Sequence, residues 1–385
     1  MEHNDRSHQH SAEPHARRSM AESPTPLPPP ARKPKPPLSR LMRLSLKVVD
    51  RAADATRRAD GTLNRRALSL LDPRVPAISS PCRGVASRDL VLDPSTRLRA
   101  RLFYPDTSKA KAKPASSSAL PVIVFFHGGG FAFFSASSAA YDAACRRIAR
   151  YSNAAVLSVN YRRSPEHKFP APYDDGLAAL RFLDGDPAKN HLPVPLDASR
   201  CYLAGDSAGG NIAYHVACRY ASAAASFKNL RLAGLIAIQP FFGGEERTPA
   251  ELRLGGGAAP IVSVERADWM WRAFLPPGAD RTHPAANFAH PDAADGLDSP
   301  AFPPVLLAVG GFDPLQDWQR RYGEMLKGRG KDVRVVEYPD AIHAFYLFPG
   351  FDDARDFIIR IAEFVAESAG SGGDVGDFVM CGEHV

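Results

Sequence analysis

The stretch CYLAGDSAGGN at residues 201–211 determines the fold that this chain is expected to adopt. Its first four residues predict a buried strand, whereas the residues from Asn211 onward predict a helix. Between the two lies GDSAG at 205–209, a GxSxG pentapeptide. Small residues around the serine allow a tight strand-to-helix turn that lifts the hydroxyl above a sheet. The stretch therefore predicts Ser207 as a nucleophile within an α/β fold.

Apolar runs typical of buried strands alternate with helical patterns along the remainder of the chain. Several runs are apolar on both faces, as parallel strands are when helices cover them. The alternation predicts an α/β fold with a mostly parallel, doubly wound sheet, preceded by an antiparallel strand at 98–104. The expected parallel strands are 122–126, 156–160, 201–204, 232–238, 305–309 and 333–338, and the expected helices include 141–151, 174–183, 211–225, 318–327 and 353–368.

A second glycine-rich segment, HGGGF at 127–131, directly follows the expected strand 122–126. Glycines at such a position let backbone N–H groups point into a cavity without obstruction by side chains. Together with the N–H of Ala208, these groups are expected to form an oxyanion hole. A phosphate-binding loop is disfavoured, because no GK[ST] follows and the GxGxxG spacing is absent. His127 itself is expected to be structural.

A serine nucleophile needs a general base, and in this architecture the chain order is serine, acid, histidine. Three histidines follow residue 283. His384 lies in a glycine-rich terminal stretch, and His290 precedes the strand that should deliver the acid. His343 follows the expected strand 333–338 and lies in a loop. His343 is therefore the predicted base.

The acid is expected where a parallel strand ends, because catalytic loops gather at the carboxyl edge of such a sheet. Asp313 comes directly after the strand 305–309 and is the predicted acid. Asp317 is the competitor, although its expected role is to cap the next helix. Asp340 lies too near His343 in sequence, and Asp206 is expected to make structural hydrogen bonds. The predicted triad is Ser207, Asp313 and His343.

The net charge of +6 is concentrated at the N-terminus. Residues 1–66 hold 14 Lys/Arg and 7 Asp/Glu, whereas the other 319 residues hold 34 basic and 35 acidic side chains. A neutral body argues against a nucleic-acid partner. The five cysteines are scattered without a CxxC pair, which predicts reduced thiols and no zinc site. No apolar run reaches the roughly 20 residues of a membrane span, and we expect a cytoplasmic or nuclear protein.

A basic amphipathic helix is expected near the N-terminus, over residues 38–58. Ser39 can cap it, and basic residues occupy the face opposite the apolar positions. The apolar face is expected to dock onto the following domain, with a membrane surface as the alternative. The apolar positions are Leu41, Leu44, Val48, Ala52 and Ala55.

On these residues, the chain resembles the plant carboxylesterases of the hormone-sensitive-lipase branch of α/β hydrolases. The likeness covers roughly residues 40–365, and six segments occur in the same order. It implies the α/β-hydrolase fold, the same triad, an oxyanion hole at Gly128, Gly129 and Ala208, and no metal or cofactor. The segments are HGGGF at 127–131, SPEHKFPAPYDDG at 164–176, GDSAGGN at 205–211, QPFFGGEERT at 239–248, GGFDPLQDWQRRY at 310–322 and AIHAFYLFP at 341–349.

The same family contains the gibberellin receptor, in which a hydrolase fold binds a hormone and has lost catalysis. RADGTLNR at 58–65 resembles the N-terminal region of that receptor, which forms a lid over the pocket. Two differences favour an enzyme. The receptor has an aliphatic residue where this chain has His343, and it has HGGS where this chain keeps Gly130.

Differences from the esterase pattern are milder. Arg163-Ser164 replaces the usual Leu-Ala, and Ala344 replaces the usual glycine after the histidine. The methyl group of Ala344 is expected to crowd the acyl pocket slightly, which affects rate and substrate size.

The resulting hypothesis is a serine carboxylesterase that hydrolyses a small-molecule ester through an acyl-enzyme. The alternative is a non-catalytic hormone-binding protein resembling the gibberellin receptor, with a protein partner bound through the lid. The expected regions are a disordered tail at 1–37, a basic lid helix at 38–66, a catalytic domain at 67–368 and a flexible tail at 369–385. An apolar pocket is expected from Phe131, Tyr141 and Tyr346, together with Phe133, Phe241 and Trp269.

Overall fold

The computed structural model of the protein describes residues 36, 38–58, 60–106, 119–186 and 191–367. The predicted tail at 369–385 and all but Pro36 of the predicted tail at 1–37 lie outside these residues. None of the helices in the described part of the chain is long and apolar enough to cross a membrane.

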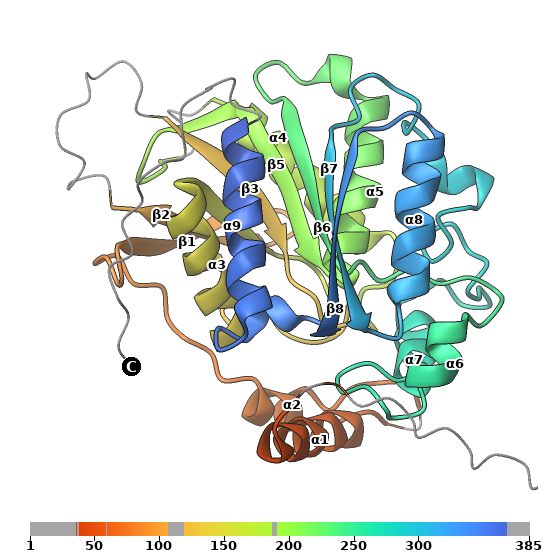
Figure 1. Cartoon of the computed structure of the whole chain (residues 1–385). Coiled ribbons are helices and arrows are strands. Elements are labelled where there is room, and N and C mark those ends of the chain that lie inside the picture. Colours follow the sequence, from red (N-terminus) through yellow and green to blue (C-terminus); the bar gives the residue numbers. More distant parts are fainter. Residues whose placement is uncertain (1–35, 37, 59, 107–118, 187–190, 368–385) are drawn as a thin grey trace, which may run out of the picture. The chain divides into compact units, whose positions relative to one another are not determined.

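The described residues form an eight-stranded sheet with the order β1-β2-β4-β3-β5-β6-β7-β8 (Figure 1). Strand β2 pairs antiparallel with both β1 and β4, whereas all the other neighbouring strands are parallel. This arrangement confirms the predicted α/β sheet and its antiparallel strand. The strands are β1 (Val85–Asp93), β2 (Leu98–Pro105), β3 (Leu120–Phe126), β4 (Ala155–Asn160), β5 (Leu196–Asp206), β6 (Leu232–Ile238), β7 (Val305–Phe312) and β8 (Val333–Ile342).

Helices cover both faces of the sheet (Figure 1). Successive side chains of a strand point to opposite faces, so Leu203 of β5 packs in the core with α4, α5 and α8. Its neighbours Tyr202 and Ala204 pack in the other core, with α3 and α9. These five helices confirm the predicted ones, and they are α3 (Ala139–Ser152), α4 (Ala171–Asp184), α5 (Ala208–Ser222), α8 (Gln316–Gly328) and α9 (Asp352–Glu367).

Several elements were not predicted from the sequence pattern. Most are too short for apolar periodicity to distinguish them from loops. They include strand β1, the helices α2 (Arg65–Leu71), α6 (Pro249–Leu254) and α7 (Val264–Phe274), and the 3-10 turns Ala224–Ser226, Pro291–Ala294 and Phe345–Leu347.

Helix α1 (Arg40–Ala55) confirms the predicted amphipathic helix and its cap. The Ser39 hydroxyl accepts a hydrogen bond from the N–H of Met42 at 3.1 Å. The predicted docking face is wrong, however, because its large apolar residues point outward. The exposed fractions are 75% for Leu41, 60% for Leu44 and 60% for Val48.

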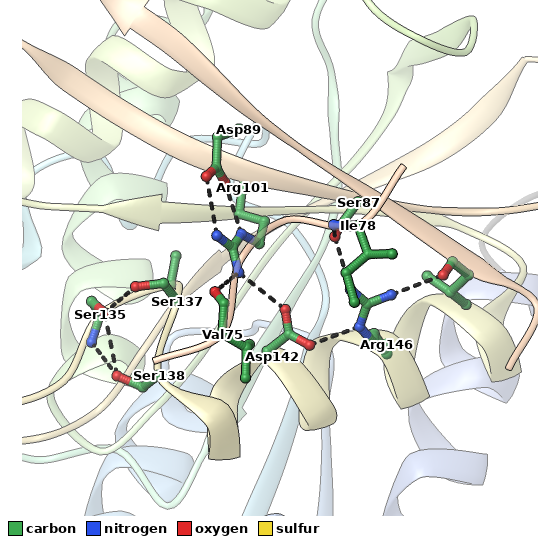
Figure 2. A network of polar contacts seen from close by, with 12 residues as sticks. Val75, Ile78, Ser87, Asp89, Arg101, Ser135, Ser137, Ser138, Asp142 and Arg146 are labelled. Carbon is green, nitrogen blue, oxygen red and sulfur yellow. Dashed lines mark hydrogen bonds and ion pairs between the residues drawn. The ribbon is translucent and has the colours of Figure 1, made fainter. Parts of the chain in front are cut away.

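A polar network joins the β1–β2 hairpin to α3 (Figure 2). Arg101 of β2 pairs with Asp89 of β1 at 2.7 Å and with Asp142 of α3 at 3.2 Å. Arg146 pairs with the same Asp142 at 2.7 Å. Arg101 also donates to the carbonyl of Val75 at 2.8 Å. The network therefore fixes the segment that runs from α2 into the sheet.

Candidate active site

Ser207 lies in the sharp turn between β5 and α5, as the GxSxG pentapeptide predicts. Its backbone has φ 53° and ψ −120°, a conformation that L-residues rarely adopt. The turn needs glycines on both sides, because a Cβ on Gly209 would stand 1.9 Å from the Phe126 carbonyl oxygen. A Cβ on Gly205 would stand 2.4 Å from the backbone of Gly209. The strained turn holds the serine at the carboxyl edge of the sheet.

Asp313 and His343 meet at the same edge of the sheet. His343 Nδ1 lies 2.7 Å from Asp313 Oδ2, and both side chains are buried. Burial alone would lower the pKa of His343, but the charge and hydrogen bond of Asp313, with help from Asp206, raise this pKa above its usual value. The structure thus brings together the two residues that chain order had selected as base and acid.

The competing candidates have other contacts. Asp317 accepts a hydrogen bond from the N–H of Ala250 at 2.8 Å, so it holds the start of α6. His290 accepts one from the N–H of Asp292 at 3.2 Å, as a cap of the turn that follows it. Neither side chain contacts the Asp313–His343 pair, and His384 lies outside the described residues.

Two glutamines that were not predicted hold the Asp313 carboxylate. Oδ2 accepts from Gln239 at 3.1 Å and from Gln319 at 2.8 Å, while Oδ1 accepts from the N–H of Leu315 at 2.9 Å. Gln239 also accepts a hydrogen bond from the N–H of Ala344 at 2.7 Å. A signal for Gln239 was present, because it follows β6 at the edge where β5 and β7 deliver Ser207 and Asp313.

The loop after β3 departs from its predicted role at one residue. The N–H of Gly128 donates to Asp206 Oδ1 at 2.8 Å and lies 2.9 Å from the Tyr141 hydroxyl oxygen. The structure therefore argues against Gly128 as an oxyanion-hole donor, because its N–H is already used. Within the described chain, the N–H groups of Gly129, Gly130 and Ala208 have no acceptor.

His127 is a buried structural residue, as expected. Its ring stacks on Tyr161 with 4.3 Å between ring centroids, and its Nδ1 lies 2.9 Å from the carbonyl oxygen of Gly128. Burial and the nearby charge of Arg163 lower the pKa of His127 to about 3. The ring is therefore neutral over the physiological pH range.

Ser207 and His343 line one cavity of about 360 Å³. Of the predicted pocket residues, Tyr141, Phe133 and Phe241 line it, whereas Phe131, Tyr346 and Trp269 do not. Phe131 stacks on Phe274 at 3.7 Å between ring centroids, and Tyr346 is buried in the core with α3 and α9. Most of the wall is apolar and includes Leu46, Ala53, Leu68, Phe133, Met270 and Leu347.

Ala344 also lines this cavity. It adopts a left-handed conformation with φ 57°, which glycine adopts more easily than alanine. This backbone conformation explains why the resemblance to the esterases predicts a glycine at this position.

Helices α1 and α2, which we call the lid, supply part of the cavity wall. Arg266 of α7 attaches α1 through two carboxylates. Its guanidinium makes a two-pronged contact with Asp54, at 2.8 Å on each side, and reaches Asp50 at 2.9 Å. Asp50 also accepts from the N–H of Ile261 at 3.0 Å. These ion pairs explain why the face with Asp50 and Asp54, and not the predicted apolar stripe, turns inward.

Arg65 attaches α2 to the loops around the site. It binds Glu166 and donates to the carbonyl oxygens of Ala132 and Ser164. The lid is therefore anchored to the loop after β3 as well as to α7.

No group of three His, Cys, Asp or Glu side chains that could hold a metal ion is present in the described ranges. Among the described cysteines, Cys82, Cys145, Cys201 and Cys218 are free.

A family profile described as alpha/beta hydrolase fold matches residues 123–347, which include the loop after β3, Ser207, Asp313 and His343. This chain belongs to the α/β-hydrolase family. Within that family, its relatives place it in the plant branch related to hormone-sensitive lipase.

This α/β hydrolase is 41% identical over 321 residues to a gibberellin receptor of Arabidopsis thaliana, covering 82% of this chain and 90% of the relative. It is 38% identical over 289 residues to a probable carboxylesterase of the same plant, covering 75% and 81%. A solved hyperthermophilic esterase of Pyrobaculum calidifontis superposes with a TM-score of 0.66 at 26% identity, covering 87% of this chain and 100% of the esterase. The relatives thus include both hydrolases and receptors.

Proposed function

We propose that this protein is a serine carboxylesterase. The observation that carries the proposal is the 2.7 Å contact between His343 Nδ1 and Asp313, with His343 lining the same cavity as Ser207. A hydrogen-bonded carboxylate keeps a proton on Nδ1, so the free Nε2 acts as the base toward a serine hydroxyl. A binding protein has no need for such a pair.

In the proposed reaction, His343 takes the proton of Ser207 while the serine oxygen attacks the ester carbonyl carbon. The tetrahedral intermediate collapses when His343 returns this proton to the departing alcohol. Water then attacks the acyl-enzyme with His343 again as base, and the acid and Ser207 are released. Asp313 orients the imidazole and stabilises its positive charge throughout.

We assign the oxyanion hole to the N–H groups of Gly129, Gly130 and Ala208, in place of the trio that included Gly128. The assignment is supported by their lack of other acceptors within the described chain. Gly129 and Gly130 have positive φ values of 97° and 57°. Glycine adopts such values without strain, and both residues line the cavity that contains Ser207, which suits donors to an oxyanion.

The substrate is proposed to be a small-molecule ester whose short or medium acyl group is apolar where it meets the cavity wall. The mostly apolar wall and the volume of about 360 Å³ support this size and polarity. The test is hydrolysis of p-nitrophenyl acetate and butyrate by the full chain and by Ser207→Ala. We expect turnover by the wild type and near-background rates for the variant. Equal rates for the two proteins would refute the assignment.

A gibberellin-receptor-like function is the second candidate. It is favoured by the receptor relatives and by the lid, whose α1 and α2 supply part of the cavity wall. Such a receptor would present its lid to a protein partner. Calorimetry with a panel of gibberellins distinguishes the two functions. Binding at micromolar or lower concentration without ester turnover would favour the receptor, whereas turnover without binding favours the esterase.

A further inference from the structure

A second cavity lies next to the proposed active-site cavity, between α2 and the loop that joins β4 to α4. Its volume is about 290 Å³. The two cavities share Leu68 and Asp72 in their walls. Unlike the first, this cavity is lined mainly by charged and polar side chains. Its other lining residues are Arg65, Ser69, Arg74, Arg163, Glu166 and His167.

Three arginines face two carboxylates in this second cavity. Arg65 is neutralised by its ion pair with Glu166. Arg74 Nε stands 3.8 Å from Asp72 Oδ2, a long contact, and Asp72 also accepts from the Ser138 hydroxyl at 2.9 Å. Both carboxylates are thus already bound by other groups. Because three arginines face only two carboxylates, the cavity keeps an excess positive charge.

Arg163 carries this excess. Its guanidinium donates to the carbonyl oxygen of Phe134, and no carboxylate pairs with it among the described residues. The residue is half-buried, so water compensates its charge only in part. Burial, together with the charges of Arg65 and Arg74, lowers the pKa of Arg163, although Tyr161 and the more distant charge of Asp72 act against this fall. An arginine in such surroundings is stabilised when an anion enters.

We propose that this second cavity binds a small oxyanion, a carboxylate or a phosphate, with Arg163 as its principal ligand. The planar guanidinium can hold two oxygens of such an anion at once, and Arg74 can approach it from the lid side. The anion has two possible sources. It is either a free ion or the acidic end of an ester that reaches past Asp72 from Ser207, and this second source rests on the proposed function.

Binding is tested first with inorganic phosphate and with succinate, by calorimetry on the full chain at low ionic strength. We expect saturable binding that weakens about ten-fold or more in Arg163→Leu, because charge-assisted hydrogen bonds are lost. Leucine is the residue that the esterase pattern has at this position. Arg163→Lys keeps the charge but loses the planar guanidinium that can hold two oxygens at once, so it should bind with intermediate affinity. Such a result would show that the weaker binding of Arg163→Leu is not due to misfolding.

Arg329→Leu is the matched control, since it removes the same charge from a half-exposed arginine paired with Asp298. It should bind both anions as the wild type does. The proposal is overturned if the wild type binds neither anion, or if Arg163→Leu and Arg329→Leu bind phosphate equally well. This binding experiment needs no catalysis, so its result does not depend on whether the proposed esterase activity is correct.

A kinetic arm separates the two sources. The hydrolysis of p-nitrophenyl hydrogen succinate, which carries a carboxylate, is compared with that of p-nitrophenyl butyrate, which does not. If phosphate and Arg163→Leu raise the KM of the succinate ester alone, the site holds the acidic end of the substrate. If phosphate binds but affects both esters equally or neither, the site holds a free anion.

Discussion

Asp206 accepts a hydrogen bond from the backbone N–H of Gly128 at 2.8 Å. The contact joins the residue before the nucleophile to the loop after β3, which begins 79 positions upstream of Asp206 in the sequence. Tyr141 strengthens the link, since its hydroxyl donates to the other carboxylate oxygen at 3.0 Å. Burial raises the pKa of Asp206 to about 6, although His343, Tyr141 and Gly128 act against this rise. Asp206 therefore holds the proposed oxyanion-hole loop against the nucleophile turn.

We predict that Asp206→Asn lowers kcat by roughly ten-fold, because a charge-assisted hydrogen bond is replaced by a weaker neutral one. The acid limb of the pH–rate profile should also move to lower pH, since the Asp206 charge helps to raise the pKa of His343. Steady-state kinetics across pH measures both effects. Tyr141→Phe removes the contacts of the phenol hydroxyl but leaves the hydrogen bond between Asp206 and the N–H of Gly128 in place. It should lose less activity, and a larger loss there would contradict this role for Asp206.

Asp313→Asn is predicted to reduce kcat by roughly 10³- to 10⁴-fold, because an amide cannot hold the productive imidazole tautomer. Asp317→Asn is the matched control, since Asp317 lies four residues further on, in the first turn of α8, but binds the start of α6. It should keep kcat within about two-fold of the wild type. Circular dichroism verifies that both variants fold, and the reverse pattern of losses would identify Asp317 as the acid.

The pH dependence of kcat/KM follows from the raised pKa of His343. A protonated imidazole cannot accept the Ser207 proton, so the rate on a neutral ester should rise with pH. We expect the midpoint above about 6.5, the ordinary histidine value. The raised pKa of His343 also affects the stability of the fold. The Asp313–His343 ion pair stabilises the folded state fully at a pH below the pKa that this histidine has in the unfolded chain. The contribution is lost as the pH rises through the pKa that it has in the folded protein. A midpoint below 6 would contradict the proposed pairing.

Asp54→Asn is predicted to loosen the lid, because Arg266 loses one of its two carboxylates. Amide hydrogen exchange in α1 should accelerate, and KM should rise while kcat changes less. Glu265 provides the control, since it also pairs across the lid, with Arg57 at 3.3 Å, but is 85% exposed. Exposed ion pairs contribute little, so Glu265→Gln should leave exchange unchanged. Equal exchange in all three proteins would show that these ion pairs do not anchor the lid.

Residues whose roles follow from strand ends were predictable from the sequence. Ser207, Asp313 and His343 each follow a strand of a parallel sheet, and such a sheet gathers these ends at one edge. The orientation of α1 was not predictable from its apolar pattern. It depends on Arg266, which meets Asp50 across 216 positions of sequence, and no local periodicity records such a pairing.

Two kinds of site prediction were wrong because tertiary contacts, which leave no local sequence pattern, decide them. Glycine spacing shows that the loop after β3 can expose N–H groups, but not which of them another side chain occupies. Asp206 occupies the N–H of Gly128. Aromatic residues near a motif are also ambiguous, because Phe131 follows the glycines yet stacks on Phe274 in the core.

The central claim is that Ser207 is an activated nucleophile, and covalent labelling with a fluorophosphonate tests it most directly. Such reagents react with serines that a neighbouring base activates. Intact-protein mass spectrometry should show a single phosphonyl adduct on the full chain, which peptide analysis assigns to Ser207. The adduct should be absent in Ser207→Ala and form far more slowly in His343→Ala. A folded wild-type protein that acquires no adduct, or acquires it at the same rate as His343→Ala, would contradict the account.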